Sequence, residues 1–204
     1  MTSTQEEMTD GFRNLFKSER LVYTALEETD KCKELWWKAR HLNVVNRALI
    51  DAGQPYPPSR IESDKDLARS VDEKKAELAV MVCLPATAAD QEPTPIGYII
   101  INRTFPRSGA YHVSFLEEHQ NKGYGREAIN WSLDYAFQWA NMHRLAIGCL
   151  SYNERAMHLY ESMGFVKESH MRSCFYKNGR YHDLIEFAML RTEWEKLRGI
   201  VGSV

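Results

Sequence analysis

The sequence predicts an α/β fold in which helices flank one mixed β-sheet. Short apolar segments typical of strands are interspersed with amphipathic segments in which apolar residues recur every three or four positions. Three strand-like segments follow one another before residue 117, an order that favours an antiparallel meander. A strand–helix–strand order follows, which favours a parallel pair. We therefore expect a sheet that is mostly antiparallel and locally parallel in its middle.

The N-terminal part carries the less regular segments. The expected elements are a loosely ordered segment 1–18 with a short helix around 12–16, a strand at 21–26, a helix capped by Asp30, a second helical piece at 44–52, a Pro-rich loop at 54–59 and a charged helix at 63–77. The chain has 204 residues, of which 44% are hydrophobic. Residues 19–204 are therefore enough for a single domain with one sizeable core.

The remainder of the chain is more regular. Its expected elements are strands at 78–84, 96–102, 111–116, 145–150, 165–174 and 181–190, and helices at 123–140 and 153–163. In the longer helix Ile129, Leu133 and Phe137 fall on one apolar face. Gly164 is placed to end the second helix, and Asn178-Gly179 predicts a tight hairpin between the last two strands.

Charge and cysteine content argue against several classes of protein. The net charge is −2 and no block of Lys or Arg stands out, which argues against a nucleic-acid groove or a polybasic membrane patch. No apolar run is long enough to cross a bilayer, and the first ten residues lack the features of a secretory signal. The four cysteines are scattered without paired spacing, so we expect reduced thiols, no metal site and a cytoplasmic location, with a nuclear one as the alternative.

The most informative segment is the turn Gln120-Asn121-Lys122-Gly123-Tyr124-Gly125, between an expected strand and an expected helix. A glycine-bearing turn at a helix N-terminus presents free backbone N–H groups and a positive dipole end, and glycines let the backbone approach a ligand closely. The turn is therefore suited to hold a phosphate-bearing ligand.

A second motif follows the next strand. Its residues are Ser151-Tyr152-Asn153-Glu154-Arg155-Ala156, and the helix that they open ends in Leu159-Tyr160-Glu161-Ser162-Met163-Gly164-Phe165. The two motifs, in this order, resemble those of the GNAT superfamily of acyl-CoA N-acyltransferases, over roughly residues 18–198. The tail from Phe175 to Asp183 is similar to a branch that contains acetyltransferases of ribosomal-protein N-termini and of polyamines.

The resemblance implies the GNAT fold, in which the central mixed sheet is splayed between the strands at 111–116 and 145–150. It implies that acetyl-CoA binds there, with its pantetheine arm inserted as a pseudo-strand and its diphosphate on the turn. The residues expected to bind the cofactor are Phe115, Leu116, Glu117, Gln120, Asn121, Lys122, Gly123, Tyr124, Gly125, Arg126, Asn153 and Tyr160. Asn153 is also a plausible helix N-cap, and the two roles can coexist.

Three residues are expected to carry the chemistry. Tyr160 would give a proton to the leaving CoA thiolate, because a phenol held near the sulfur can donate one. The N–H of Leu116 would polarise the thioester carbonyl. Glu118 is the expected general base. Glu117, His112, His119, His170 and a water chain remain open alternatives for the base.

The acceptor is expected to be a primary amine that attacks acetyl-CoA directly in a ternary complex. Trp37, His112, Ser114 and Asp183 are the candidate substrate residues, although packing could explain Trp37 and the hairpin could explain Asp183. A peptide N-terminus, a polyamine and a small toxic amine all remain open. For the oligomeric state, a monomer and a homodimer both remain open. The alternative function is that of an acyl-CoA-binding sensor or scaffold with little turnover.

Overall fold

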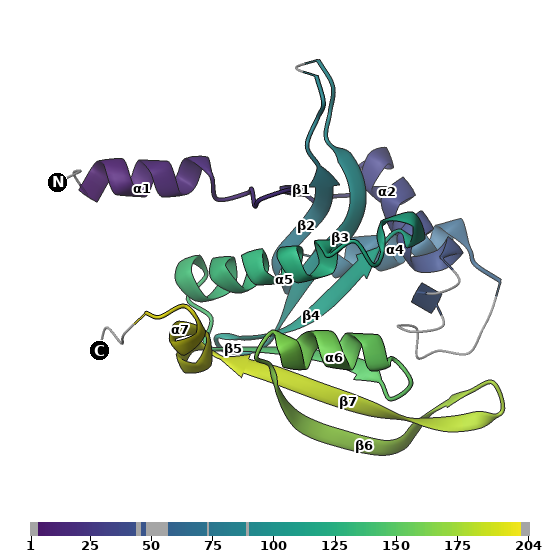
Figure 1. Cartoon of the computed structure of the whole chain (residues 1–204). Helices are drawn as coiled ribbons and strands as arrows, with labels where there is room; N and C mark the ends of the chain where they lie inside the picture. Colours follow the sequence, from purple (N-terminus) through teal and green to yellow (C-terminus); the bar gives the residue numbers. More distant parts are fainter. Residues whose placement is uncertain (1–3, 44–45, 48–56, 73, 89, 201–204) are drawn as a thin grey trace.

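A computed structural model of the chain describes residues 4–43, 46–47, 57–72, 74–88 and 90–200. It has one seven-stranded sheet in the order β1-β2-β3-β4-β5-β7-β6 (Figure 1). The strands are β1 (Val22–Ala25), β2 (Ala76–Leu84), β3 (Thr94–Phe105), β4 (Ser108–Phe115), β5 (Arg144–Leu150), β6 (Val166–Lys177) and β7 (Arg180–Leu190). Among the described strands, β4 and β5 alone pair in parallel, so the predicted mixed sheet is confirmed.

The helices lie on the sheet or extend from it. They are α1 (Thr4–Arg13), α2 (Asp30–Trp36), η1 (Trp37–Leu42), α4 (Arg60–Ser70), the short turn η2 (Glu117–His119), α5 (Tyr124–Asp134), its π-helical continuation η3 (Tyr135–Trp139), α6 (Glu154–Ser162) and α7 (Arg191–Leu197). Helix α1 extends away from the sheet, and the β2–β3 hairpin projects beyond it (Figure 1).

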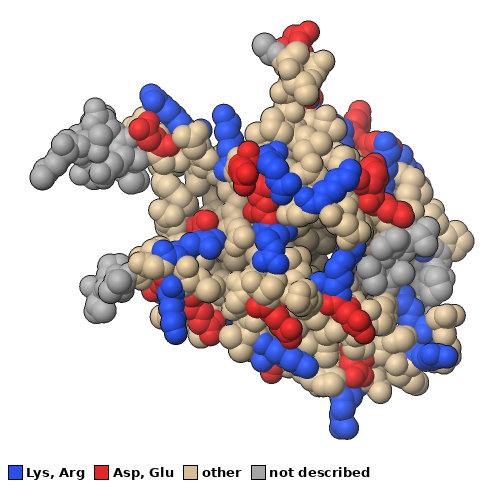
Figure 2. Space-filling model, in the orientation of Figure 1, with Lys and Arg blue, Asp and Glu red and all other residues tan. Residues whose placement is uncertain are grey.

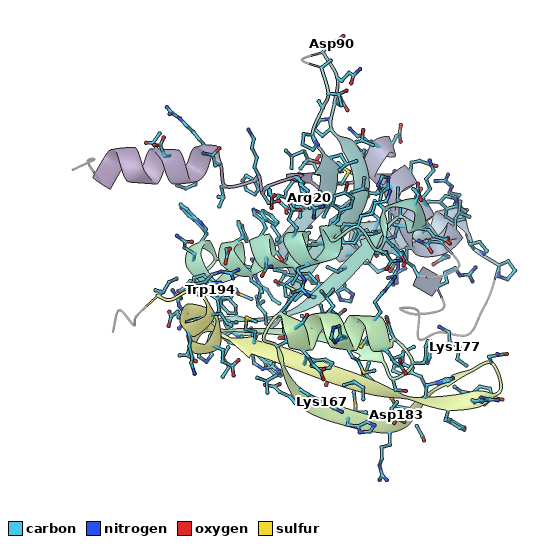
Figure 3. The ribbon with its side chains drawn as sticks, in the orientation of Figure 1. Arg20, Asp90, Lys167, Lys177, Asp183 and Trp194 are labelled. Carbon is cyan, nitrogen blue, oxygen red and sulfur yellow. The ribbon has the colours of Figure 1, made fainter. Side chains whose placement is uncertain are left out.

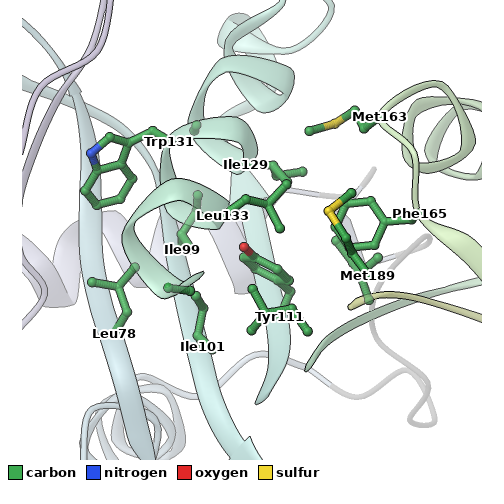
Figure 4. Close-up of a cluster of buried hydrophobic side chains, with 14 of the residues drawn as sticks. Leu78, Ile99, Ile101, Tyr111, Ile129, Trp131, Leu133, Met163, Phe165 and Met189 are labelled. Carbon is green, nitrogen blue, oxygen red and sulfur yellow. The ribbon is translucent and has the colours of Figure 1, made fainter. Parts of the chain in front are cut away.

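Two hydrophobic clusters hold these layers together. The larger cluster packs α5, α6 and α7 on the sheet and includes Leu133, Phe137 and Phe187 (Figure 4 shows part of it). The smaller cluster packs α2, η1 and α4 over β2 and β3, with Trp36 against Tyr98 at 4.6 Å between ring centroids. The clusters lie on opposite faces of the sheet, because successive strand side chains point to opposite faces.

Local signals in the sequence placed several element ends correctly. The Asn153 side chain accepts a hydrogen bond from the N–H of Ala156, which confirms it as the N-cap of α6. Gly164 has φ +91° after α6, and Asn178 and Gly179 have φ +49° and +77° in the β6–β7 turn. Such left-handed conformations favour Gly and Asn, which explains their places in the sequence.

Two expectations for the N-terminal part were wrong, and two others fall in large part outside the described residues. The helix in segment 1–18 is α1, which ends at Arg13, so it lies earlier than the short helix expected around 12–16. Phe12 lies in α1 and packs on Trp139, and Phe16 lies in the turn that follows and packs on Trp131. The cap of α2 is Thr29, whose side chain accepts from the N–H of Cys32, and not Asp30. The piece expected at 44–52 lies mostly outside the described residues, as does the first half of the Pro-rich loop.

The charged helix expected at 63–77 is also displaced. Helix α4 begins at Arg60 and ends at Ser70, and the chain enters β2 at Ala76. There Ala76 pairs with Asn102 of β3 and Glu77 forms an ion pair with Arg103 at 2.6 Å. Pairing with β3 therefore makes Ala76 and Glu77 part of a strand, although the spacing of charges in this segment favours a helix.

Candidate active site

The parallel strands β4 and β5 separate after only three paired positions, from Ser108–Arg144 to Ala110–Ala146. A cavity of about 560 Å³ opens where they part. It is lined by β4 residues from Tyr111 to Phe115 and by β5 residues from Ile147 to Leu150, together with the turn before α5 and one face of α6. The splay expected between these strands is therefore present, and it forms a cleft.

The turn before α5 presents main-chain donors to this cleft. Gly123 caps α5 with φ +82°, Asn121 has φ +60°, and the first backbone bond of the helix runs from Glu127 N–H to the Gly123 carbonyl. The N–H groups that precede Glu127 thus have no intrahelical acceptor. Gln120, Asn121, Gly123, Gly125 and Arg126 line the cleft, but Lys122 and Tyr124 do not. The arrangement suits an anion at the helix N-terminus.

Arg155 is a feature of the cleft for which sequence reasoning assigned no role. Its guanidinium donates to the side-chain oxygens of Asn121 at 2.7 Å and Gln120 at 3.2 Å, so α6 and the turn are joined across the cleft mouth. Arg126 also lines the cleft and donates to Ser162 at 2.6 Å. Lys and Arg side chains lie beside the hollow between α5 and α6 in Figure 2. A basic residue two positions after Asn153 was the available signal.

The structure contradicts the role predicted for the N–H of Leu116. That N–H donates to the carbonyl of Ile96 on β3 at 2.8 Å, and Leu116 does not line the cleft. Because backbone groups alternate sides in an antiparallel ladder, the N–H groups of Val113 and Phe115 point away from β3 and toward the gap. The prediction was wrong by one step of this alternation.

A buried amide cluster at the end of β4 also escaped the sequence analysis. Asn46 is 6% exposed, and its Nδ2 donates to Phe115 O at 2.9 Å and Ser114 Oγ at 2.6 Å. Its Oδ1 accepts from Gln120 Nε2 at 3.0 Å. Asn43 Nδ2 also donates to Phe115 O, at 3.3 Å. Nothing in a local pattern distinguishes a buried asparagine from a solvated one.

Tyr160 lies in the cleft wall and is 8% exposed. Its ring packs against Phe187, with 5.8 Å between ring centroids. Burial, and then the neighbouring thiol of Cys149, raise the pKa of the Tyr160 phenol above its usual range. The phenol is therefore protonated at neutral pH, the form that a proton donor needs.

The base candidates divide into two groups. Glu117 and Glu118 are exposed residues of η2 and neither lines the cleft, so the structure does not bring Glu118 to the site. His112 and His119 both line it. The His112 side chain is exposed to solvent at the cleft, but the atoms around it there still desolvate its charged form. This desolvation, and then the charge of Arg40, lower the pKa of His112, which favours a neutral imidazole near pH 7.

The other substrate candidates lie in different places. Ser114 lines the cleft but is 3% exposed and is bonded to Asn46. Trp37 lies outside the lining, stacked on His41 and beneath Arg60 at 4.5 Å. Asp183, labelled in Figure 3, accepts from the N–H of Ser173 at 2.7 Å and bonds His170 Nε2 at 2.6 Å. These contacts support a hairpin role for Asp183.

Comparisons with known proteins agree with this geometry. Residues 45–165 match the model of the acetyltransferase (GNAT) family. The chain belongs to the GNAT family. It is 39% identical over 88 residues to a spermidine N(1)-acetyltransferase of Vibrio cholerae, a match that covers 43% of the chain and about half, 51%, of that relative. It is 36% identical over 146 residues to the L-amino acid N-acyltransferase MnaT of Escherichia coli, covering 69% and 81% respectively.

Solved structures extend the likeness to most of the fold. A spermidine N-acetyltransferase of Vibrio cholerae in complex with CoA and spermine superposes with a TM-score of 0.63 at 25% identity, covering 87% of this chain and 99% of that one. A further structure of that GNAT relative is dodecameric. GNAT acetyltransferases use acetyl-CoA, the cofactor that the motifs predicted.

None of the helices described is long and apolar enough to cross a membrane. Within the described residues, no group of three His, Cys, Asp or Glu side chains is arranged to hold a metal ion.

Proposed function

We propose that this GNAT protein is an acetyl-CoA-dependent N-acetyltransferase that acetylates a primary amine by direct attack in a ternary complex. One observation carries the proposal: a cleft opens between β4 and β5, with unpaired main-chain donors at one end and a buried, protonated tyrosine in its wall. Main-chain donors suit a diphosphate, and a protonated phenol suits a departing thiolate.

The residues of the cleft fit acetyl-CoA. The turn from Gln120 to Arg126 would hold the diphosphate through N–H groups, with the cations of Arg126 and Arg155 beside it. The edge of β4 leaves the N–H groups of Val113 and Phe115 facing the gap, where a pantetheine arm can bond them. Asn153 is bound to its own helix through Oδ1 and could donate to the same arm through Nδ2.

Acetyl-CoA supplies the acetyl group as a thioester, and the amine nitrogen displaces the CoA sulfur. The N–H groups of Val113 and Phe115 polarise the carbonyl, a role that replaces the one predicted for Leu116. Tyr160 gives its proton to the CoA sulfur as the carbon–sulfur bond breaks. Because the raised pKa makes this phenol a weak acid, proton transfer accompanies bond breaking, which its place in the cleft wall allows. The phenolate then regains a proton from solvent.

His112 is the residue that we assign as general base in place of Glu118. An amine with a pKa of about 10 is mostly protonated at neutral pH and must lose a proton before it attacks. His112 lines the cleft, and its lowered pKa keeps it neutral and able to accept that proton. Ser114 lies two residues along the same strand face, bonded to Asn46.

The acceptor is proposed at the level of a primary amine. One relative is named for spermidine and another for L-amino acids, and both groups of substrate carry such an amine. A polyamine, an amino acid and a peptide N-terminus therefore form the first panel to test. The protein is proposed to act as a monomer or homodimer in the cytoplasm, as expected from the sequence.

Isothermal calorimetry with CoA and a thiol-release assay with the amine panel test this function together. We expect CoA binding and acetyl-CoA cleavage that at least one amine accelerates. Tight CoA binding without amine-dependent thiol release would favour the sensor or scaffold alternative. Absence of CoA binding would contradict both.

A further inference from the structure

The buried amide cluster at the end of β4 links parts of the molecule that are far apart in the sequence. Asn46 Nδ2 donates to Ala39 O on η1 at 2.8 Å and to Phe115 O on β4 at 2.9 Å. Through Oδ1 the same side chain holds Gln120, the first residue of the turn. One side chain therefore fixes η1, the end of β4 and the phosphate turn against one another.

The Phe115 carbonyl is the group on which this cluster converges. It accepts from Asn43 at 3.3 Å, Asn46 at 2.9 Å and Gln120 Nε2 at 3.1 Å. A carbonyl oxygen has two lone pairs, so its capacity to accept is used up. It lies on the gap side of β4, where a ligand bonded along the strand edge would otherwise find an acceptor.

We infer that Asn46 is a positioning residue that sets the register of the pantetheine arm on β4. Because its amide covers the Phe115 carbonyl, an arm lying along the edge bonds the groups before that carbonyl and cannot slide one step toward the turn. A fixed register keeps the thioester beside Tyr160, and small misplacements of reacting groups lower rates strongly. The inference deepens the proposed function and rests on it.

Asn46→Asp is the sharpest variant because it keeps the size and the acceptor Oδ1 and removes the Nδ2 donor. The Phe115 carbonyl then faces an oxygen in a buried site and keeps only the longer hydrogen bonds from Asn43 and Gln120, so it is held less firmly in place. We expect CoA to bind about tenfold more weakly, the factor that one lost hydrogen bond in a buried site represents. We also expect kcat with acetyl-CoA to fall, because the thioester is no longer held in one position.

A matched control distinguishes a general loss of stability from a specific effect on CoA binding. Trp194 is 4% exposed, and its Nε1 donates to Asp134 at 2.7 Å, outside the residues that line the cleft. Trp194→Phe removes one partly buried hydrogen bond and should lower the melting temperature without changing the Kd of CoA. Asn46→Ser provides a second replacement that keeps a small donor and should bind CoA more tightly than Asn46→Asp.

Acetyl-pantetheine, which lacks the phosphates, tests which part of the ligand Asn46 acts on. Loss of turnover in Asn46→Asp with both acetyl-CoA and acetyl-pantetheine supports a register role. Loss confined to acetyl-CoA overturns it, because the effect would then run through Gln120 and the diphosphate turn. A folded Asn46→Asp that binds CoA within twofold of the wild type also overturns it. If the wild-type chain itself fails to bind CoA, the proposed function fails instead.

Discussion

The two walls of the cleft differ in the groups that they present to a ligand. The wall assigned to the cofactor consists of main-chain groups: the turn before α5 and the edge of β4. The wall assigned to the acceptor consists of side chains, with His112 on β4 near Arg40 of η1. Main-chain sites depend on a few glycines at fixed spacing, so sequence motifs reveal them. Side-chain sites depend on which elements pack together, which a local pattern does not contain.

Tyr160 is the strongest test of this contrast, because it is a side chain that we assign to the cofactor side. Tyr160→Phe keeps the ring and its contact with Phe187 and removes only the phenolic proton. We expect kcat to fall by roughly 100-fold or more, the usual contribution of a general acid. The Kd of CoA should change less than about threefold, since no anchoring group is lost. Steady-state kinetics and calorimetry on the same preparation give both numbers.

An unchanged kcat in Tyr160→Phe would contradict the proton-donor role. A loss of CoA affinity as large as the loss of kcat would instead assign Tyr160 to binding. The second result would weaken the division between a main-chain cofactor wall and a side-chain acceptor wall, because a side chain would then bind the cofactor.

His112 tests the acceptor wall through pH. The pKa of His112 is lowered in the folded protein. The imidazole therefore stays neutral at pH values somewhat below the ordinary histidine pKa, and it takes up a proton only as the pH falls further. We expect the acid limb of kcat/KM in the wild type to lie below pH 6.5, the ordinary value for histidine. His112→Gln should lower kcat/KM by about 100-fold and abolish this limb.

The comparison is made at saturating acetyl-CoA, so that only the acceptor side is varied. Glu118→Gln serves as the matched variant, since Glu118 was the base predicted from sequence but is exposed and outside the cleft lining. If Glu118→Gln loses activity while His112→Gln keeps it with the same pH profile, the assignment of His112 is wrong.

The sequence predicted the main-chain wall well and the packing around it poorly. Gly123 and the Asn153 cap could be found because their roles follow from local backbone geometry. The sequence analysis assigned the N–H donor at the end of β4 to Leu116, which was wrong. The edge of β4 to which each N–H points depends on the register of β4 with β3, and a local sequence pattern does not contain that register. Asn46 was missed because its burial arises only when η1 packs on β4.

Gly123 tests whether the turn binds through its backbone conformation. Gly123 has φ +82°, and a Cβ there would lie 3.2 Å from a terminal nitrogen of Arg20. Gly123→Ala must strain this conformation or leave it, at a cost of about 1–2 kcal/mol. We expect CoA to bind about tenfold more weakly, measured by calorimetry. Gly179→Ala is the control, because φ is +77° and a Cβ there meets nothing within 4 Å.

If Gly123→Ala and Gly179→Ala lose similar stability and neither changes the Kd of CoA, the turn does not bind the diphosphate through its backbone. Weaker binding in Gly123→Ala alone would support the main-chain wall, since the two variants introduce the same kind of strain at different places.

Cys149 lies between the two walls and should show the smallest effect. It is a buried residue of β5 that lines the cleft, and burial raises the pKa of its thiol to about 11. Only about one thiol in ten thousand is then ionised at pH 7, whereas a nucleophilic cysteine needs its thiolate. We therefore expect Cys149→Ala to keep kcat within about threefold, since direct transfer forms no acetyl-enzyme. Mass spectrometry after incubation with acetyl-CoA alone should find no acetyl group on this thiol. An acetylated Cys149 that amines then discharge would require a two-step reaction, and Tyr160 would protonate the CoA sulfur before the acceptor had entered.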